Sequence, residues 1–147
     1  MFDRIVVALD GSQRGERVLG PAVELAERMK RPLHLIRVAD LTWLRFGVNE
    51  AALEYATLGE ELADERRDAE TYLELIARPL RERGLTVTVE ARSGLAAREL
   101  IAATKPSDLL AMASHGRGGP ARWLLGSVVE EVVRHAVCPV LVIRAHD

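Results

Sequence analysis

The sequence has few of the residues on which several common kinds of protein site depend. It contains one cysteine, Cys138, which excludes an internal disulfide framework and a cysteine-rich metal site. Its four histidines, at positions 34, 115, 135 and 146, are spaced too widely for the motifs of zinc sites, so we expect no metal site. Only two of its 20 basic residues, Lys30 and Lys105, are lysines, and neither lies beside a glycine-rich loop. A Walker-type phosphate lysine is therefore also missing.

Long hydrophobic runs and a strong net charge are missing too. The opening MFDRIVVALDGS has an apolar run of only Ile5 to Leu9, too short for the centre of a signal peptide, and no later run approaches membrane-spanning length. A formal net charge of -2 gives no reason to expect a nucleic-acid partner. With 147 residues, 48% of them apolar, the chain has the size and balance of one globular domain, residues 1–147, which we expect in the cytoplasm.

Short apolar stretches alternate with amphipathic ones along the whole chain. The apolar stretches predict strands at residues 4–10, 32–40, 85–92, 108–114 and 138–144. Helical spacing of apolar residues predicts a helix from Ser12 to about Met29 with a kink at Gly20-Pro21, a long helix with the stripe Leu62, Ala69, Leu73, Ile76 and Leu80, a short helix after Gly94, and a helix from Ser127 to about Ala136.

This alternation predicts an α/β fold with a single doubly wound, five-stranded parallel sheet of order 3-2-1-4-5 and helices on both faces. Ligands of such sheets bind beyond the carboxyl ends of the strands, where the strand order reverses. Here the reversal lies between the first and fourth strands. We therefore expect residues 10–12 and the loop that follows residue 114 to face one crevice.

That second loop lies in the stretch ASHGRGGPARWLLGSVVEE, residues 113–131. Its glycines, at 116, 118 and 119, let backbone N–H groups approach a ligand, and Arg117 could neutralise a phosphate. Gly126 and Ser127 begin a helix, whose first N–H groups attract anions. Alternatively, Ser127 and Glu130 have the S-x-x-E spacing of a capping box, which would occupy the same N–H groups. The spacing leaves both interpretations open.

Other conspicuous residues also have two interpretations. Asp10 follows the first strand at the expected crevice, yet it could equally cap the first helix. Cys138 precedes an apolar strand and has no acid-base partner in a motif, which favours a buried small side chain over a nucleophile. The segment 41–59 holds Trp43, Phe46 and Tyr55, and it could be a lid, a partner surface or a hydrophobic anchor.

The stretch ASHGRGGPARWLLGSV, with ALDGS near the start and CPVLVIR near the end, resembles the universal stress protein family over the whole chain. The ATP-binding branch of that family has the pattern glycine, two residues, glycine, nine residues, glycine, then serine or threonine. Gly116, Gly126 and Ser127 match it with the same spacing, while Ala113 replaces the first glycine. The Ala113 methyl group would either crowd the ribose or fit without strain if its φ is negative.

The resemblance implies a Rossmann-like fold of the adenine nucleotide alpha hydrolase type with ATP as its ligand, and it allows Mg²⁺ to accompany ATP. By position, Asp10 would meet adenine or ribose between Ala8, Leu9 and the backbone near Val38. Met112 and Ala113 would lie along the nucleotide, and Gly116 would approach ribose or phosphate. His115 would either touch a phosphate or fill the loop. The phosphates would be held by Gly126, Ser127 and Val128.

Catalytic machinery is not evident in the sequence, because no Ser-His-Asp set, Cys-His set or carboxylate pair occurs as a motif. The first hypothesis is an ATP-dependent stress-response switch with at most slow hydrolysis. The fifth strand would be a sheet edge, and its apolar residues Val140, Leu141, Val142 and Ile143 predict a homodimer, which the resemblance also implies. The second hypothesis, favoured by Ala113, is a nucleotide-free dimeric interaction protein that engages a protein partner near residues 41–59.

Overall fold

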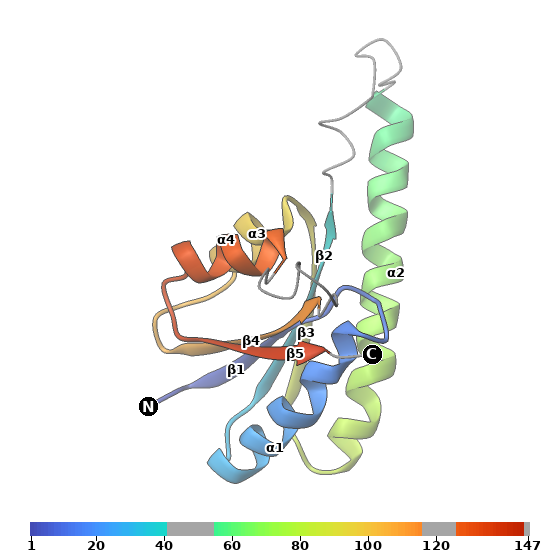
Figure 1. The fold of residues 1–147 in the computed structure, drawn as a ribbon. Coiled ribbons are helices and arrows are strands. Elements are labelled where there is room, and N and C mark those ends of the chain that lie inside the picture. The colour runs from blue at the N-terminus through green and yellow to red at the C-terminus, as the bar shows by residue number, and fades with distance from the viewer. Residues whose placement is uncertain (41–54, 116–125, 146–147) are drawn as a thin grey trace.

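The protein folds into one parallel sheet covered by helices (Figure 1). The computed structural model describes residues 1–40, 55–115 and 126–145, and the side chains of these other than 40, 55–59, 61 and 115. The strands are β1 (Arg4–Ala8), β2 (Leu33–Asp40), β3 (Val87–Gly94), β4 (Asp108–His115) and β5 (Val140–Ala145). The helices are α1 (Leu19–Met29), α2 (Tyr55–Glu82), α3 (Ala96–Ala102) and α4 (Ser127–His135), with a 3-10 helix at Gly15–Val18.

The strand order is β3-β2-β1-β4-β5 with all neighbours parallel, so the predicted topology is confirmed. Residues of β1 alternate between two cores, since Ile5 and Val7 face one side of the sheet and Val6 faces the other. All three are completely buried, which explains why this strand is apolar without interruption. One core lies beneath α1 and α2 and includes Leu73; the other lies beneath α3 and α4 and includes Leu100.

The first helical segment differs from the prediction. A single helix kinked at Gly20-Pro21 was expected, whereas a 3-10 turn at Gly15–Val18 leads directly into α1 at Leu19. Pro21 consequently lies in the first turn of α1, where a missing N–H costs little because such groups have no partner within the helix.

Cys138 is buried, and burial raises the pKa of its thiol, in agreement with a packing role.

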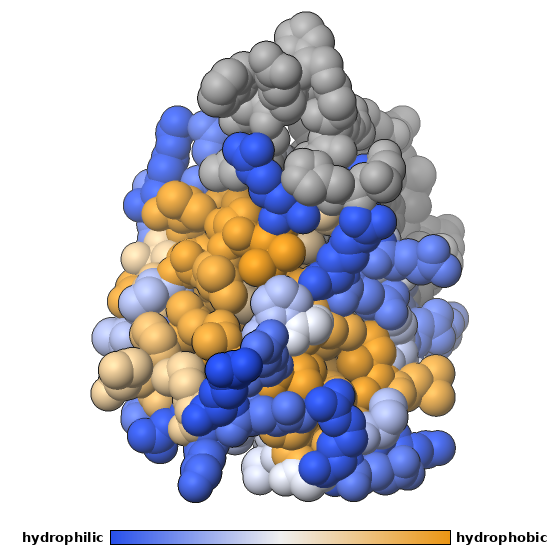
Figure 2. Space-filling view, turned by 60° about the horizontal axis from the view of Figure 1, so that its bottom comes forward, coloured by the Kyte–Doolittle hydropathy of each residue, from blue (hydrophilic) through white to orange (hydrophobic). Residues whose placement is uncertain are grey.

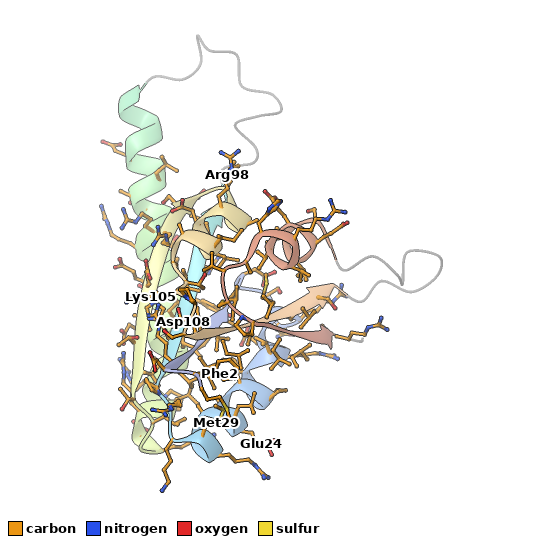
Figure 3. All side chains as sticks on the ribbon, turned by 90° about the vertical axis from the view of Figure 1, so that its left-hand side faces the viewer. Phe2, Glu24, Met29, Arg98, Lys105 and Asp108 are labelled. Atoms are coloured by element: carbon orange, nitrogen blue, oxygen red, sulfur yellow. The ribbon has the colours of Figure 1, made fainter. Side chains whose placement is uncertain are left out.

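The amino ends of β1 and β4 are joined by a buried ion pair. The Asp108 carboxylate accepts hydrogen bonds from Arg4 Nε at 2.9 Å, from Arg4 Nη2 at 3.2 Å and from the Lys105 N–H at 2.8 Å. Figure 3 shows Lys105 and Asp108 side by side. Burial alone would raise the pKa of Asp108, but these hydrogen bonds and the Arg4 charge outweigh it, so the pKa lies below its usual value.

The two sheet edges differ in their side chains. On β5, Val140, Leu141, Val142 and Ile143 are each only half-buried, and in the described residues this strand pairs with β4 alone. Figure 2 shows two areas of apolar surface separated by a band of charged side chains on one face of the molecule. No helix of the described residues is long and apolar enough to cross a bilayer.

Candidate functional site

A cavity of about 570 Å³ lies at the carboxyl ends of the central strands. It extends from β2 and α2, past the end of β1, to β4 and the start of α4. This is the point where the strand order reverses, which is where the topology places ligands. Its lining includes the predicted residues Ala8, Leu9, Asp10, Val38, Met112, Ala113, Gly126, Ser127 and Val128. The fold therefore brings these residues together from four segments, and their role as ligand contacts stays a prediction.

The turn after β1 is built on the Asp10 side chain. Asp10 Oδ1 accepts hydrogen bonds from the Ser12 N–H at 2.9 Å and from Ser12 Oγ at 2.6 Å. Ser12 Oγ in turn accepts one from the Gly15 N–H at 2.9 Å, at the start of the 3-10 helix. The capping interpretation of Asp10 is wrong, because the N-cap residues of the 3-10 helix and of α1 are Arg14 and Val18 and neither helix has a side-chain cap among the described residues. Asp10 is exposed and lines the cavity, and its role as a ligand contact stays a prediction. The carboxylate organises the turn and faces the space a ligand would occupy.

The start of α4 forms the opposite wall. Gly126 is the N-cap residue with φ of 93° and ψ of 150°, a conformation that favours glycine, and no described side chain caps the helix. The capping-box alternative is therefore wrong, because Ser127 is the first helical residue and is exposed, while Glu130 pairs with Arg134 at 3.0 Å. The first N–H groups of α4 thus face the cavity without a capping side chain.

Ala113 causes no backbone strain at the position where the family motif has glycine. It lies within β4, paired with Ile143, and it is not among the described residues with positive φ. Its methyl group packs against the core beneath α1 and α2, whereas Met112 belongs to the opposite core. The methyl group of Ala113 was expected either to crowd the ribose or to fit without strain, and the backbone conformation agrees with the fit without strain.

Three charged residues that sequence reasoning missed also line the cavity: Arg37 on β2, and Glu65 and Asp68 on α2. Glu65 and Asp68 lie in the strongly charged stretch 60–70 of the long helix, and nothing local distinguishes them from their neighbours. Arg37 did carry a signal, since it is the one full charge in the stretch 33–39, and it directly follows the buried residues 33–36. Charged residues are rarely placed in a strand covered on both faces without a partner or a function.

Part of the predicted site lies outside the described residues. Gly116 and Arg117 belong to this part. Trp43 and Phe46, whose segment 41–59 was expected to be a lid, a partner surface or a hydrophobic anchor, also lie outside the described residues. The backbone of His115 ends β4, but its side chain is not described.

A second, more open hollow of about 610 Å³ follows edge strand β3. Its charged side chains largely neutralise one another: Arg92 pairs with Glu90 at 2.7 Å and with Glu99 at 3.0 Å. Glu90 also lies 2.8 Å from Nε2 of the buried His34. Because this hollow lies away from the reversal point and most of its charges are already paired, the cavity beside Asp10 is the better candidate site.

A model of the universal stress protein family matches residues 1–144. The chain belongs to this family. Universal stress protein MJ0531 of Methanocaldococcus jannaschii is 30% identical over 146 residues, covering 98% of this chain and 83% of that protein. The family assignment accordingly rests on nearly the whole length of the chain.

Solved structures of family members share the fold. Universal stress protein UspA from Lactobacillus plantarum superposes with a TM-score of 0.78 at 26% identity, covering 97% of this chain and 98% of that one. A universal stress protein solved in complex with cAMP superposes with a TM-score of 0.61 over 99% of this chain and 98% of its own, at 21% identity. At that identity the likeness supports the common fold alone.

Proposed function

We propose that this protein binds ATP in the cavity beside Asp10 and acts as a nucleotide-dependent switch in a stress response, with at most slow hydrolysis. One observation carries the proposal: a single cavity joins Asp10 to the uncapped start of α4. Free helical N–H groups and the positive end of the helix dipole suit a phosphate chain. The universal stress protein that was solved with cAMP gives further support for an adenine nucleotide.

Each end of the cavity has a role in this proposal. Gly126, Ser127 and Val128 hold the phosphates, with His115, Gly116 and Arg117 on the loop before them, and Mg²⁺ offsets part of the phosphate charge. Met112 and Ala113 lie along the nucleotide, while Asp10 meets the ribose or base between Ala8, Leu9 and Val38. The whole chain, residues 1–147, acts as one domain in the cytoplasm.

Calorimetry with Mg-ATP at millimolar concentration tests the proposal. We expect binding heat and a rise in melting temperature, because a ligand that binds only the folded state stabilises it. Freshly purified protein, once denatured, should also release adenine nucleotide. In Gly126→Val a branched side chain enters both the glycine conformation and the phosphate path, so the shift should disappear. If the wild-type protein gives neither heat nor shift, the nucleotide-free interaction protein becomes the better hypothesis.

The same proposal includes a homodimer paired through β5. The half-buried apolar side chains of this edge favour it, since an exposed apolar edge strand otherwise invites uncontrolled pairing. Light scattering should give about twice the chain mass of 16.2 kDa, and a monomer at high concentration would contradict the dimer.

A further inference from the structure

Arg37 is held in a fixed position at the β2 end of the cavity. Its guanidinium carbon lies 4.9 Å from the centroid of the Tyr72 ring, a cation-π distance. A Cβ atom built on Gly11 would lie 2.7 Å from Cζ and 2.8 Å from each Nη. Because Cζ is the nearest of the three atoms, the Gly11 backbone approaches the flat face of the guanidinium and not its edge. Gly11, with φ of 87°, is thus required both by its turn and by this approach.

Within the part of the chain that the structure describes, this packing leaves the donor edge of the Arg37 guanidinium without a hydrogen-bond partner. Among the described residues, no oxygen accepts a hydrogen bond from Arg37, although its side chain is half-buried and lines the cavity. By contrast, Arg92 on the neighbouring strand bonds both Glu90 and Glu99. A half-buried guanidinium with free N–H groups beside a cavity is a ready donor for a ligand.

The position of Arg37 determines which part of a nucleotide it would meet. Arg37 lies on β2 and the start of α4 follows β4, with β1 between these two strands. Neighbouring strands are about 4.8 Å apart, so the two ends of the cavity are separated by roughly 10 Å. Phosphates at α4 would therefore leave the base and sugar near Arg37. Glu65 and Asp68 line the same end, where their negative charge disfavours phosphate.

We infer that Arg37 recognises the nucleoside part of the ligand, donating hydrogen bonds from its guanidinium edge to acceptor atoms of the purine or ribose. This inference rests on the proposed function and assigns a residue outside the family motif. Tyr72 provides the supporting surface. Burial raises the pKa of Tyr72 above the usual phenol value, and the Glu16 carboxylate raises it further, so the ring stays neutral beneath the cation.

Calorimetric titration of the full-length protein with adenosine, AMP and ATP tests the assignment. Arg37→Met should weaken all three ligands by the same factor, about tenfold, because it removes a charged donor to the part they share. Arg37→Lys, which keeps the charge and loses the planar fork, should fall in between. Arg31→Met is the matched control, since it removes the same charge in the connection just before β2, away from the cavity, and should leave binding unchanged.

Ligand analogues separate a direct contact from a merely structural role. Wild-type protein should lose affinity for one member of the set 2′-deoxy-ATP, 1-deaza-ATP, 3-deaza-ATP and 7-deaza-ATP, and Arg37→Met should not distinguish that member from ATP. Equal losses in both proteins for every analogue would overturn the assignment, as would a loss for Arg37→Met that grows with the number of phosphates. If wild-type protein binds none of the nucleotides, the proposed function fails together with the inference. If it binds ATP and Arg37→Met binds equally well, only the inference fails.

Discussion

The two ends of the sheet differ in whether their polar groups are hydrogen-bonded within the protein. At the amino ends of β1 and β4, Asp108 accepts three hydrogen bonds and is 1% exposed. At the carboxyl ends, the first N–H groups of α4 lack a capping side chain, and the donors of Arg37 find no acceptor among the described residues. A polar group that the protein satisfies itself contributes to stability, whereas one left open beside a cavity is available to a ligand. This contrast favours the same candidate site without reference to any motif.

The largest effect is expected from a substitution at the amino ends of β1 and β4, which we call the closed end because the protein satisfies the polar groups there itself. In Asp108→Ala the Arg4 guanidinium loses its partner in a largely buried position, so the free energy of unfolding should fall by about 3 kcal/mol. For a chain of this size the melting temperature should drop by roughly 6–12 °C. The matched control is Glu130→Ala, which removes one exposed helical ion pair worth about 0.3–0.5 kcal/mol. Comparable losses in the two variants, measured by denaturant unfolding, would contradict the difference in burial.

The pH dependence of stability gives a second, smaller effect at the same end. Because the pKa of Asp108 is lowered by folding, its contribution is complete above the ordinary value of 3.8 and is lost as the pH falls through the lower pKa of the folded state. Wild-type protein should therefore lose more stability than Asp108→Asn over this acid range. Parallel pH profiles of the free energy of unfolding would show that Asp108 does not titrate as described.

The smallest effect on stability is expected at the carboxyl ends of the strands, which we call the open end because polar groups there are left beside the cavity. Ser127→Ala removes an exposed hydroxyl that caps nothing, so the free energy of unfolding should change by less than about 0.5 kcal/mol. Affinity for ATP should nevertheless fall about tenfold if the hydroxyl binds a phosphate.

Thr104→Val is the counterpart of Ser127→Ala at the closed end. Its hydroxyl is buried and donates to the Ile101 carbonyl at 2.9 Å, so stability should fall by about 1 kcal/mol with no change in affinity. Calorimetry and thermal unfolding of both variants would show whether the two properties separate in this way.

The fold could be predicted because its signals are local. An uninterrupted apolar strand such as 5–7 can only be covered on both faces, and alternation with helices then gives the parallel order. Asp10 and Gly126 were predicted to face one crevice because each follows a central strand. Glu65 and Asp68 could not be added, since their access to the cavity depends on how α2 passes over β2, which no local pattern records. Arg37 could have been added, because it is the one full charge among residues 33–39. The capping box failed for a related reason: helix α4 begins one residue too early for Ser127 to cap it.

The two edge strands of the sheet, β5 and β3, differ in their side chains, and this difference limits how many copies of the chain could associate by strand pairing. Two copies joined through β5 would present only β3 outward, where Glu90 and Arg92 are charged and the Arg81 side chain already donates to the Val87 carbonyl. Charged side chains and occupied backbone groups discourage a further strand from adding. Association along the sheet would therefore close at a pair and would not extend into a filament.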